Sequence, residues 1–219
     1  MTPTPPPASP AIPRRRRVLV CGFGPFPGMP SNPSSRLATA LGRLARPALG
    51  DVEVVVRLLP TTWEAVAEAP ALLDEVQPDA ILLLGVAGRR RQVCVETLAF
   101  NRAADAPDAL RRHPPARALA AGAPARLTTT AHPGRLLHAL RKVPARLSRD
   151  AGRYLCNAVY FRMLLALRDK SVPLVFVHIP GAPRLGVAAY DAALASAVGN
   201  LMVALAAQMP WGATRGARP

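Results

Sequence analysis

Three residues in an apolar background have side chains suited to nucleophilic catalysis: Cys156, His178 and Glu96. Cys156 lies at the start of an apolar segment that reads as a helix, where backbone amides and the positive end of the helix dipole favour a thiolate and lower the thiol pKa. The same amides stabilise an oxyanion after attack on a carbonyl. The alternative is a small buried hydrophobic residue.

His178 and Glu96 supply the partners that a nucleophilic thiol needs. His178 follows an apolar run and precedes Ile179 and Pro180, so it is expected at the carboxyl end of a buried strand, where a general base is well placed. Glu96 lies in an apolar stretch, and a carboxylate there is costly unless it is paired. An imidazolium would compensate this cost, as in a catalytic triad. The alternatives are a structural histidine and a glutamate that faces water on an edge strand.

A metal site is a further reading of the same residues. Cys94 precedes Glu96 by two residues and therefore lies on the same face of a strand. Together with Cys156 and His178 these side chains would offer four ligands. The spacing typical of a zinc site is absent, so we predict no metal.

Strands and helices alternate along the chain and must position these residues. Strands are predicted at residues 18–21, 52–59, 79–86 and 173–179, and a further strand or extended segment at 93–100. Helices are predicted from Asn32, a plausible cap, and at 61–76, 134–143, 155–168 and 188–208. Residues 102–126 read as a loop. The pattern predicts an α/β protein with a largely parallel sheet, whose site lies beyond the carboxyl ends of the strands.

Four separated motifs carry a resemblance to a known family. They are residues 22–28 with Asn32 to Ser34, residues 85–88 with Glu96 and Asn101, residues 151–157, and residues 176–180. In order and spacing they resemble GFxPFxG…NPS, GxAGGR…E(R)xAxN, AGxxxCN and FxHxP of pyroglutamyl-peptidase I, also called pyrrolidone-carboxylate peptidase. The similarity spans roughly residues 17–209.

The resemblance implies a three-layer α/β/α sandwich and a cytoplasmic thiol peptidase without a cofactor, which removes amino-terminal pyroglutamyl residues from peptides. It implies Glu96, Cys156 and His178 as catalytic residues. A flat, uncharged lactam ring needs an apolar slot and a few hydrogen bonds. The residues that the resemblance implies for substrate binding are Phe23, Phe26, Asn32, Val86 and Tyr154. The family often forms tetramers, so a homo-oligomer is a possible assembly.

Several positions depart from the family pattern. Arg89 stands where the family has a second glycine, Val86 replaces a common Gln, and Thr97 follows the acid where Arg is usual. An arginine that the family carries before its Pro-Asp pair is missing, and Arg90 and Arg102 are nearby candidates to replace it. A related thiol hydrolase with altered N-acyl or lactam specificity, or reduced activity, is therefore the second hypothesis.

The formal charge of +15 points to a third hypothesis, a basic binding protein. The basic residues are 26 Arg and two Lys, and residues 89–149 alone contribute +10. No aromatic residue lies between Arg102 and Arg149, although nucleic-acid surfaces commonly combine basic and aromatic side chains. The excess of Arg, Ala and Pro fits a compositional bias better, so we predict no nucleic-acid partner.

The chain ends and the cysteines bear on organisation and compartment. Residues 1–17 read as a disordered Pro/Arg-rich leader, 18–209 as one domain and 210–219 as a flexible tail. The longest uninterrupted apolar run, residues 80–88, is short of the ~20 residues that a spanning helix needs, so no membrane partner is predicted. Three cysteines without framework spacing suit a reducing cytoplasm.

Overall fold

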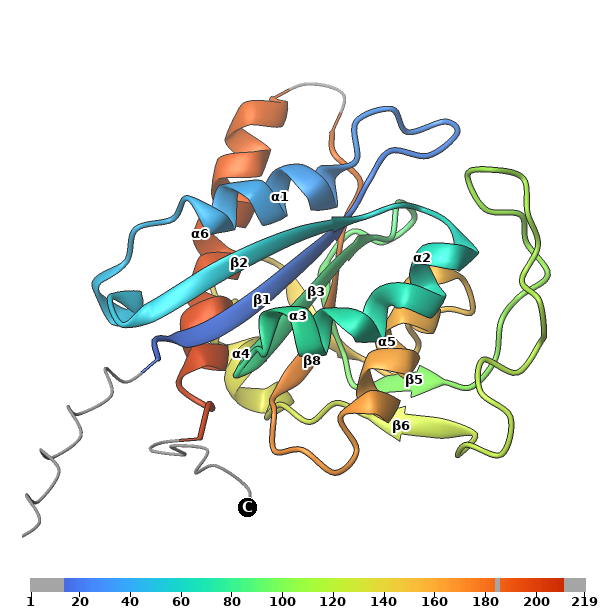
Figure 1. The fold of residues 1–219 in the computed structure, drawn as a ribbon. Coiled ribbons are helices and arrows are strands. Elements are labelled where there is room, and N and C mark those ends of the chain that lie inside the picture. Colours follow the sequence, from blue (N-terminus) through green and yellow to red (C-terminus); the bar gives the residue numbers. More distant parts are fainter. Residues whose placement is uncertain (1–13, 184–185, 211–219) are drawn as a thin grey trace, which may run out of the picture.

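A six-stranded sheet lies between two layers of helices (Figure 1). The computed structural model describes residues 14–183 and 186–210. The strand order is β2-β1-β3-β8-β4-β7, and β4 is antiparallel to β8 while the other neighbouring pairs are parallel. The strands are β1 (Arg16–Phe23), β2 (Val52–Leu59), β3 (Ala80–Val86), β4 (Val93–Glu96), β7 (Ala145–Ser148) and β8 (Leu174–Ile179).

Successive side chains of the central strands point to opposite faces of the sheet and build two separate cores. In β1, Val18 and Val20 belong to one core, and Leu19 and Cys21 belong to the other. Every residue from position 18 to 23 is buried. This explains the nearly continuous apolar runs in the sequence, because a strand covered on both faces has no polar side to show.

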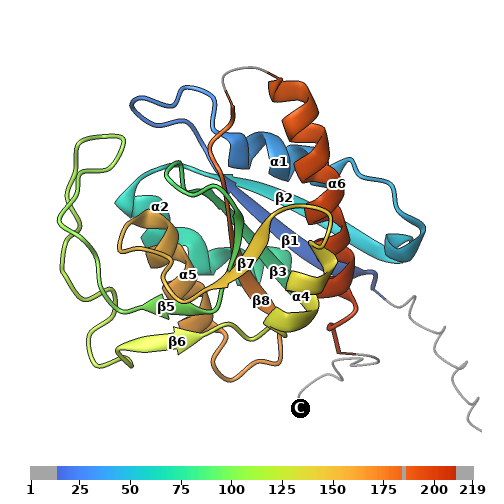
Figure 2. The same cartoon turned by 180° about the vertical axis from the view of Figure 1, so that it is seen from behind.

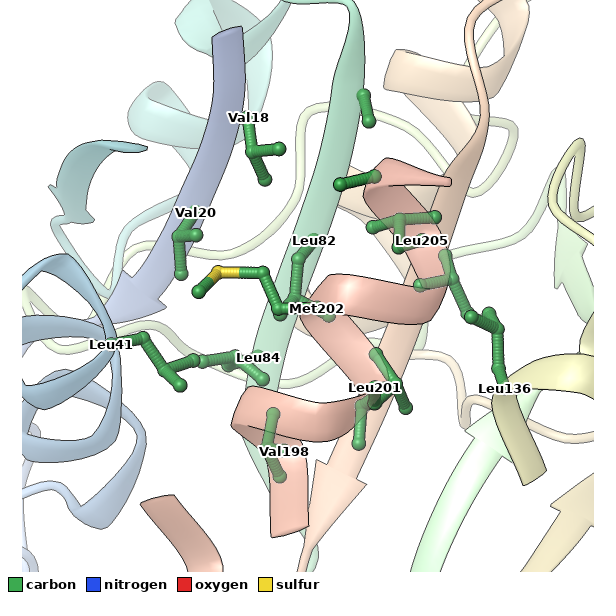
Figure 3. Close-up of a cluster of buried hydrophobic side chains, with 14 of the residues drawn as sticks. Val18, Val20, Leu41, Leu82, Leu84, Leu136, Val198, Leu201, Met202 and Leu205 are labelled. Carbon is green, nitrogen blue, oxygen red and sulfur yellow. The ribbon is translucent and has the colours of Figure 1, made fainter. Parts of the chain in front are cut away.

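Among the described residues, three α-helices pack on each face of the sheet. The first layer contains α1 (Pro33–Gly42), α4 (Pro133–Ala139) and α6 (Val187–Ala206), which Figures 1 and 2 show on one side of the sheet. The second contains α2 (Trp63–Glu68), α3 (Leu72–Val76) and α5 (Leu155–Ala166). In Figure 3, Met202 of α6 lies between Val20 and Leu82 of the sheet. The predicted three-layer sandwich is confirmed.

A second, two-stranded antiparallel sheet of β5 (Leu98–Phe100) and β6 (Arg126–Thr128) lies beside α5 (Figure 2). Residues 101–125 connect these two strands and contain no helix or strand, as predicted for most of this stretch. Short 3₁₀ helices at Pro47–Leu49 and Ala69–Ala71 complete the regular structure of the described residues.

Most predicted elements are confirmed, two predicted segments differ, and the short strands β6 and β7 were not predicted. The helix predicted at 61–76 is two helices, α2 and α3, because Pro70 cannot donate to a helical hydrogen bond and a 3₁₀ turn replaces it. The segment predicted at 93–100 is divided at Thr97 between two sheets. Strand β7, with its exposed Arg146 and Leu147, shows no buried apolar run and was not predicted.

The amino-terminal boundary lies earlier than predicted. Strand β1 begins at Arg16, and Arg14, Arg16 and Arg17 form ion pairs with Asp79, Asp51 and Glu53. Residues 14–17 are therefore part of the fold rather than of the leader. The predictions for residues 1–13 and 211–219 fall outside the described residues.

One helix corrects the expectation about membrane spans. By length and composition alone, α6 is long and apolar enough to cross a bilayer. The prediction considered only uninterrupted apolar runs, and Asp191 and Asn200 interrupt this one. In the fold, α6 packs against α1, α4 and the sheet, which is also how an apolar core helix of a folded domain behaves.

Candidate active site

The register of β4 against β8 brings Glu96 and His178 together. Glu96 lies opposite Phe176 in this antiparallel pair, and His178 is two residues further along β8 on the same face. The diagonal between such positions is short enough for long side chains to meet. His178 Nδ1 lies 2.8 Å from Glu96 Oε1, and both side chains are buried. The two residues therefore form the pair expected from the sequence.

The charge state of Glu96 fixes the tautomer of His178. Burial alone would raise the pKa of Glu96, but hydrogen bonds from His178 and Ser148 and the positive charges of His178 and Arg90 lower it below its usual range. An ionised carboxylate only accepts hydrogen bonds, so Nδ1 must carry the proton. In the neutral form of the ring, Nε2 is therefore the proton acceptor.

Cys156 stands in the first turn of α5, on the same face of the sheet. The loop before the helix turns at Gly152, whose positive φ of 80° favours glycine. A Cβ added to Gly85 would lie 2.9 Å from Cys156 Sγ, so the sulfur rests directly against this glycine. Gly85 is the register partner of His178 in the parallel β3–β8 pair. The thiol therefore lies over the strand position next to the imidazole.

The expectation of a lowered thiol pKa at this helix start is wrong. The pKa of Cys156 is raised to about 12, mainly by burial and to a smaller extent by the negative charge of Glu96, and the backbone amide of Cys156 offsets only part of this rise. At neutral pH the resting side chain is a thiol. A proton acceptor is therefore needed when the sulfur attacks, and His178 Nε2 is the group suited to that task.

Two further residues of α5 hold the acid and its strand in place. The hydroxyl of Tyr160, one turn after Cys156, donates to the backbone carbonyl of Glu96 over 3.0 Å. The Asn157 side chain accepts from the backbone amide of Phe100 and donates to the carbonyls of Phe100 and Arg102. One helix thus positions the thiol and also fixes the segment that carries the carboxylate.

The residues predicted from the first motif occupy three different environments. Phe23 ends β1 and is buried, with its ring centroid 6.4 Å from that of Phe176. Phe26 is half-buried on the following turn, where it pairs with Met29. Asn32 caps α1, as predicted; its Oδ1 accepts from Ser34, and its Nδ2 donates to the Gly24 carbonyl. Asn32 thus fixes the turn that presents Phe26.

Tyr154 borders the site on the thiol's face of the sheet, whereas the Val86 side chain packs against the core on the opposite face. Val86 ends β3 and is half-buried beside Ile179. Tyr154 caps α5 two residues before the thiol, and its hydroxyl donates to the Pro107 carbonyl over 2.7 Å. Trp63 packs edge-on against the Tyr154 ring at 5.6 Å and donates from its indole to the Ala106 carbonyl. The segment at 106–107 is thereby fixed next to the start of α5.

Sequence reasoning missed the role of Arg90. Its guanidinium donates to Glu96 Oε1 rather than standing free to replace the missing family arginine, and Arg102 is exposed. Arg89, in the position of a family glycine, does not have a positive φ, which among the described non-glycine residues only Gln77 and Arg111 have. The motif GxAGGR ends on Arg90, so the signal that separates the middle arginine from its neighbours was present in the sequence.

The described residues also bear on metal binding. No group of three His, Cys, Asp or Glu side chains in the part of the chain that the structure describes is arranged to hold a metal ion.

Comparisons with known proteins show the family of the chain. The model of the pyroglutamyl peptidase family matches residues 16–209. The pyrrolidone-carboxylate peptidase of Erwinia tasmaniensis is 32% identical over 197 residues, 84% of this chain and 91% of the relative, and that of Yersinia pestis is 34% identical over 178 residues, 78% and 81%.

Solved structures agree as well. Pyroglutamyl peptidase I of Bacillus amyloliquefaciens superposes with a TM-score of 0.77 at 28% identity, covering 88% of this chain and 97% of that one. A variant pyrrolidone carboxyl peptidase of Pyrococcus furiosus gives 0.78 at 28% identity, covering 88% and 100%. The chain therefore belongs to the pyroglutamyl peptidase family and is a hydrolase of the cysteine peptidase class.

Proposed function

We propose that this protein removes amino-terminal pyroglutamyl residues from peptides, with Cys156 as nucleophile, His178 as general base and acid, and Glu96 as the group that orients His178. The observation that carries the proposal is the buried Glu96–His178 hydrogen bond next to a thiol at the start of α5. The family match over residues 16–209 supports the substrate class.

The chemistry follows from the protonation states. His178 Nε2 takes the proton of the Cys156 thiol as the sulfur attacks the pyroglutamyl carbonyl, and the oxyanion that forms is stabilised by amides at the start of α5. The imidazolium then donates this proton to the leaving amine, and the C–N bond breaks. A water molecule, deprotonated by the same imidazole, hydrolyses the thioester and releases pyroglutamate and the free thiol.

The surroundings suit an uncharged lactam. Buried Phe23 offers apolar surface on the face of the sheet that carries the thiol, and half-buried Phe26 follows on the next turn, whereas the Val86 side chain packs against the core on the opposite face. The turn that carries Phe26 is fixed by Asn32, so the slot is held in one conformation before the substrate arrives. Tyr154 closes the side towards residues 106–107.

Compartment and assembly are part of the proposal. All three cysteines are unpaired, which suits the reducing environment of the cytoplasm. A homotetramer, implied by resemblance to the family, is expected to appear as a single species of four times the 23.2 kDa chain mass in light scattering. We propose peptides as the substrates and neither nucleic acid nor a membrane as a partner.

Hydrolysis of a pyroglutamyl fluorogenic amide tests the function. We expect turnover by the wild type and a rate lower by roughly 10³-fold or more for Cys156→Ala, because the nucleophile is lost. Cys21→Ala is the matched control, since Cys21 is a buried thiol of the same core in a strand that does not pair with β8. Equal turnover by the wild type and Cys156→Ala would contradict the assignment of the nucleophile.

Altered specificity is the second candidate, and Val86, Arg89 and Thr97 are the observations that favour it. A panel of acyl and aminoacyl amides with the same leaving group separates the two. The second candidate is favoured if another N-acyl amide is cleaved faster than the pyroglutamyl amide. A wide margin in favour of pyroglutamyl excludes it.

A further inference from the structure

Arg90 is the only side chain of the 89–91 arginine run that turns towards the site. Arg89 and Arg91 are exposed, whereas Arg90 is 23% exposed and contacts a fully buried carboxylate. A tight turn, in which the Arg90 amide donates to the Ala87 carbonyl over 2.8 Å, returns the chain towards β4. All three arginines carry the same charge, but only the Arg90 side chain is directed towards the site.

The guanidinium of Arg90 bridges the acid and the loop that leads to the nucleophile. Nη1 donates to Glu96 Oε1 over 2.5 Å, and Nη2 donates to the Asp150 carbonyl over 2.5 Å. Nη1 also lies 3.4 Å from Ser148 Oγ. Asp150 is two residues before Gly152, where the chain turns into α5. A planar fork with fixed donors suits such a bridge, and an ammonium does not.

Arg90 and His178 share one oxygen of Glu96. Both donate to Oε1, while the buried Oε2 has no hydrogen-bond partner among the described residues. These two donors, together with Ser148, define the rotamer of the carboxylate. Without Arg90, the carboxylate loses one of the donors that hold Oε1 towards His178.

From this geometry we infer that Arg90 is a positioning residue, which holds Glu96 ionised and aimed at His178 and connects this pair to the loop that presents Cys156. The inference rests on the proposed function for its kinetic test. Among the described residues Arg90 contacts Glu96, Ser148, Cys94 and the Asp150 carbonyl, so its effect on the thiol passes through Glu96 and the loop before α5.

Several titratable groups face the Glu96 carboxylate from the elements around it: the guanidinium of Arg90, the imidazole of His178 on β8, and the thiol of Cys156 and phenol of Tyr160 on α5. The positive charge of Arg90 lowers the pKa of Glu96. Its removal raises that pKa, so the acidic limb of the kcat/KM profile moves to higher pH. A role in folding alone would not move this limb.

Kinetics of Arg90→Gln, Arg90→Lys and Arg91→Gln on a pyroglutamyl fluorogenic amide test the inference. For Arg90→Gln we expect kcat to fall about 10- to 100-fold, a share of the roughly 10²–10⁴ that a positioned base supplies. KM should change little, and the acidic limb should shift upwards. Arg90→Lys restores the position of the limb but not the full kcat, because it keeps the charge without the fork. Arg91→Gln removes the same charge one residue away and should match the wild type.

Alkylation of Cys156 by iodoacetamide, followed by mass spectrometry of its peptide, gives a readout that needs no pyroglutamyl substrate. At neutral pH we expect slower alkylation in Arg90→Gln than in Arg91→Gln, because an unshielded Glu96 disfavours the thiolate. If the wild type cleaves no pyroglutamyl amide while this difference holds, the proposed function fails and the role of Arg90 stands. Equal pH profiles and alkylation rates for folded Arg90→Gln and Arg91→Gln would overturn the role of Arg90.

Discussion

At the scale of single residues, the site depends on a buried negative charge. Glu96 is fully buried, and its ionisation is stabilised by His178 and by Arg90 on the same oxygen. Removing one partner of such a group leaves a buried charge without compensation, which costs more than the interaction itself contributes. The pair is therefore better understood as a device for orienting the imidazole than as a source of stability.

The lowered pKa of Glu96 predicts how stability depends on pH. In the unfolded chain this carboxyl titrates near its usual value of about 4.3. In the folded protein its pKa is lower. The stability that the ionised carboxyl contributes is therefore fully present above the unfolded pKa and is lost as the pH falls through the folded pKa. In urea unfolding between pH 7 and pH 3, the free energy of unfolding of Glu96→Gln should decline less with falling pH than that of the wild type. At pH 7 the variant should be about 3 kcal/mol less stable. Parallel curves would contradict this.

Gly85 carries a prediction about the space around the thiol. A Cβ at this position would approach Phe176 Cζ to 2.7 Å and Cys156 Sγ to 2.9 Å. Gly85→Ala should therefore displace the sulfur from His178, lower kcat by tenfold or more, and cost about 1–3 kcal/mol of stability through overpacking. Gly88→Ala is the matched control, because nothing lies within 4 Å of its added Cβ. Equal kcat values for the two variants would show that this contact does not constrain the thiol.

At the scale of elements, the irregular segment 101–125 is held by side chains rather than by secondary structure. Asp108 is buried; its Oδ2 accepts from the Trp63 amide at the start of α2, and its Oδ1 accepts from the amides of Leu110 and Arg112. Asn101 bonds to the backbone of Ala120 from both ends of its amide. The segment thereby keeps residues 106–107 against Tyr154.

Asp108→Ala tests this anchoring. Three amides lose their acceptor, so we expect a loss of roughly 1–3 kcal/mol in unfolding free energy. We also expect faster limited proteolysis within residues 102–125. Asp105→Ala is the control on the same segment, since Asp105 is exposed and pairs only with His113 and Arg117 among the described residues. If proteolysis quickens equally in both variants, Asp108 is not the anchor.

The elements also show what a sequence can reveal of such a site. The strand ends at His178 and Glu96 and the helix start at Cys156 follow from apolar runs and their flanking residues, so the candidate residues were predictable. The antiparallel direction of β4 was not, because pairing direction is decided by contacts distant in sequence. That direction places Glu96 diagonal to His178 and turns Arg90 inward. The pKa of Cys156 was predicted from the helix start alone, and burial outweighed it.

At the scale of the whole molecule, part of the positive charge lies in ion pairs that connect neighbouring segments of the fold. Arg14, Arg16 and Arg17 pair with acids around the start of β1, and Arg36 pairs with Asp191 to connect α1 to α6. Exposed pairs of this kind each contribute only about 0–1 kcal/mol. The 13 acidic residues cannot neutralise 28 basic ones, so most of the +15 charge remains as a long-range field.

This field predicts a preference in substrate capture. Pyroglutamyl peptides with acidic residues several positions after the scissile bond should show a higher kcat/KM than matched basic peptides at low ionic strength, because a positive field raises their encounter rate. The two values should converge above about 0.5 M salt, where the Debye length falls to a few ångströms. The kcat values should be equal throughout, since the charge does not enter the chemical step. A ratio that stays constant up to 0.5 M salt would instead indicate direct contact between the acidic side chain and an arginine at the site.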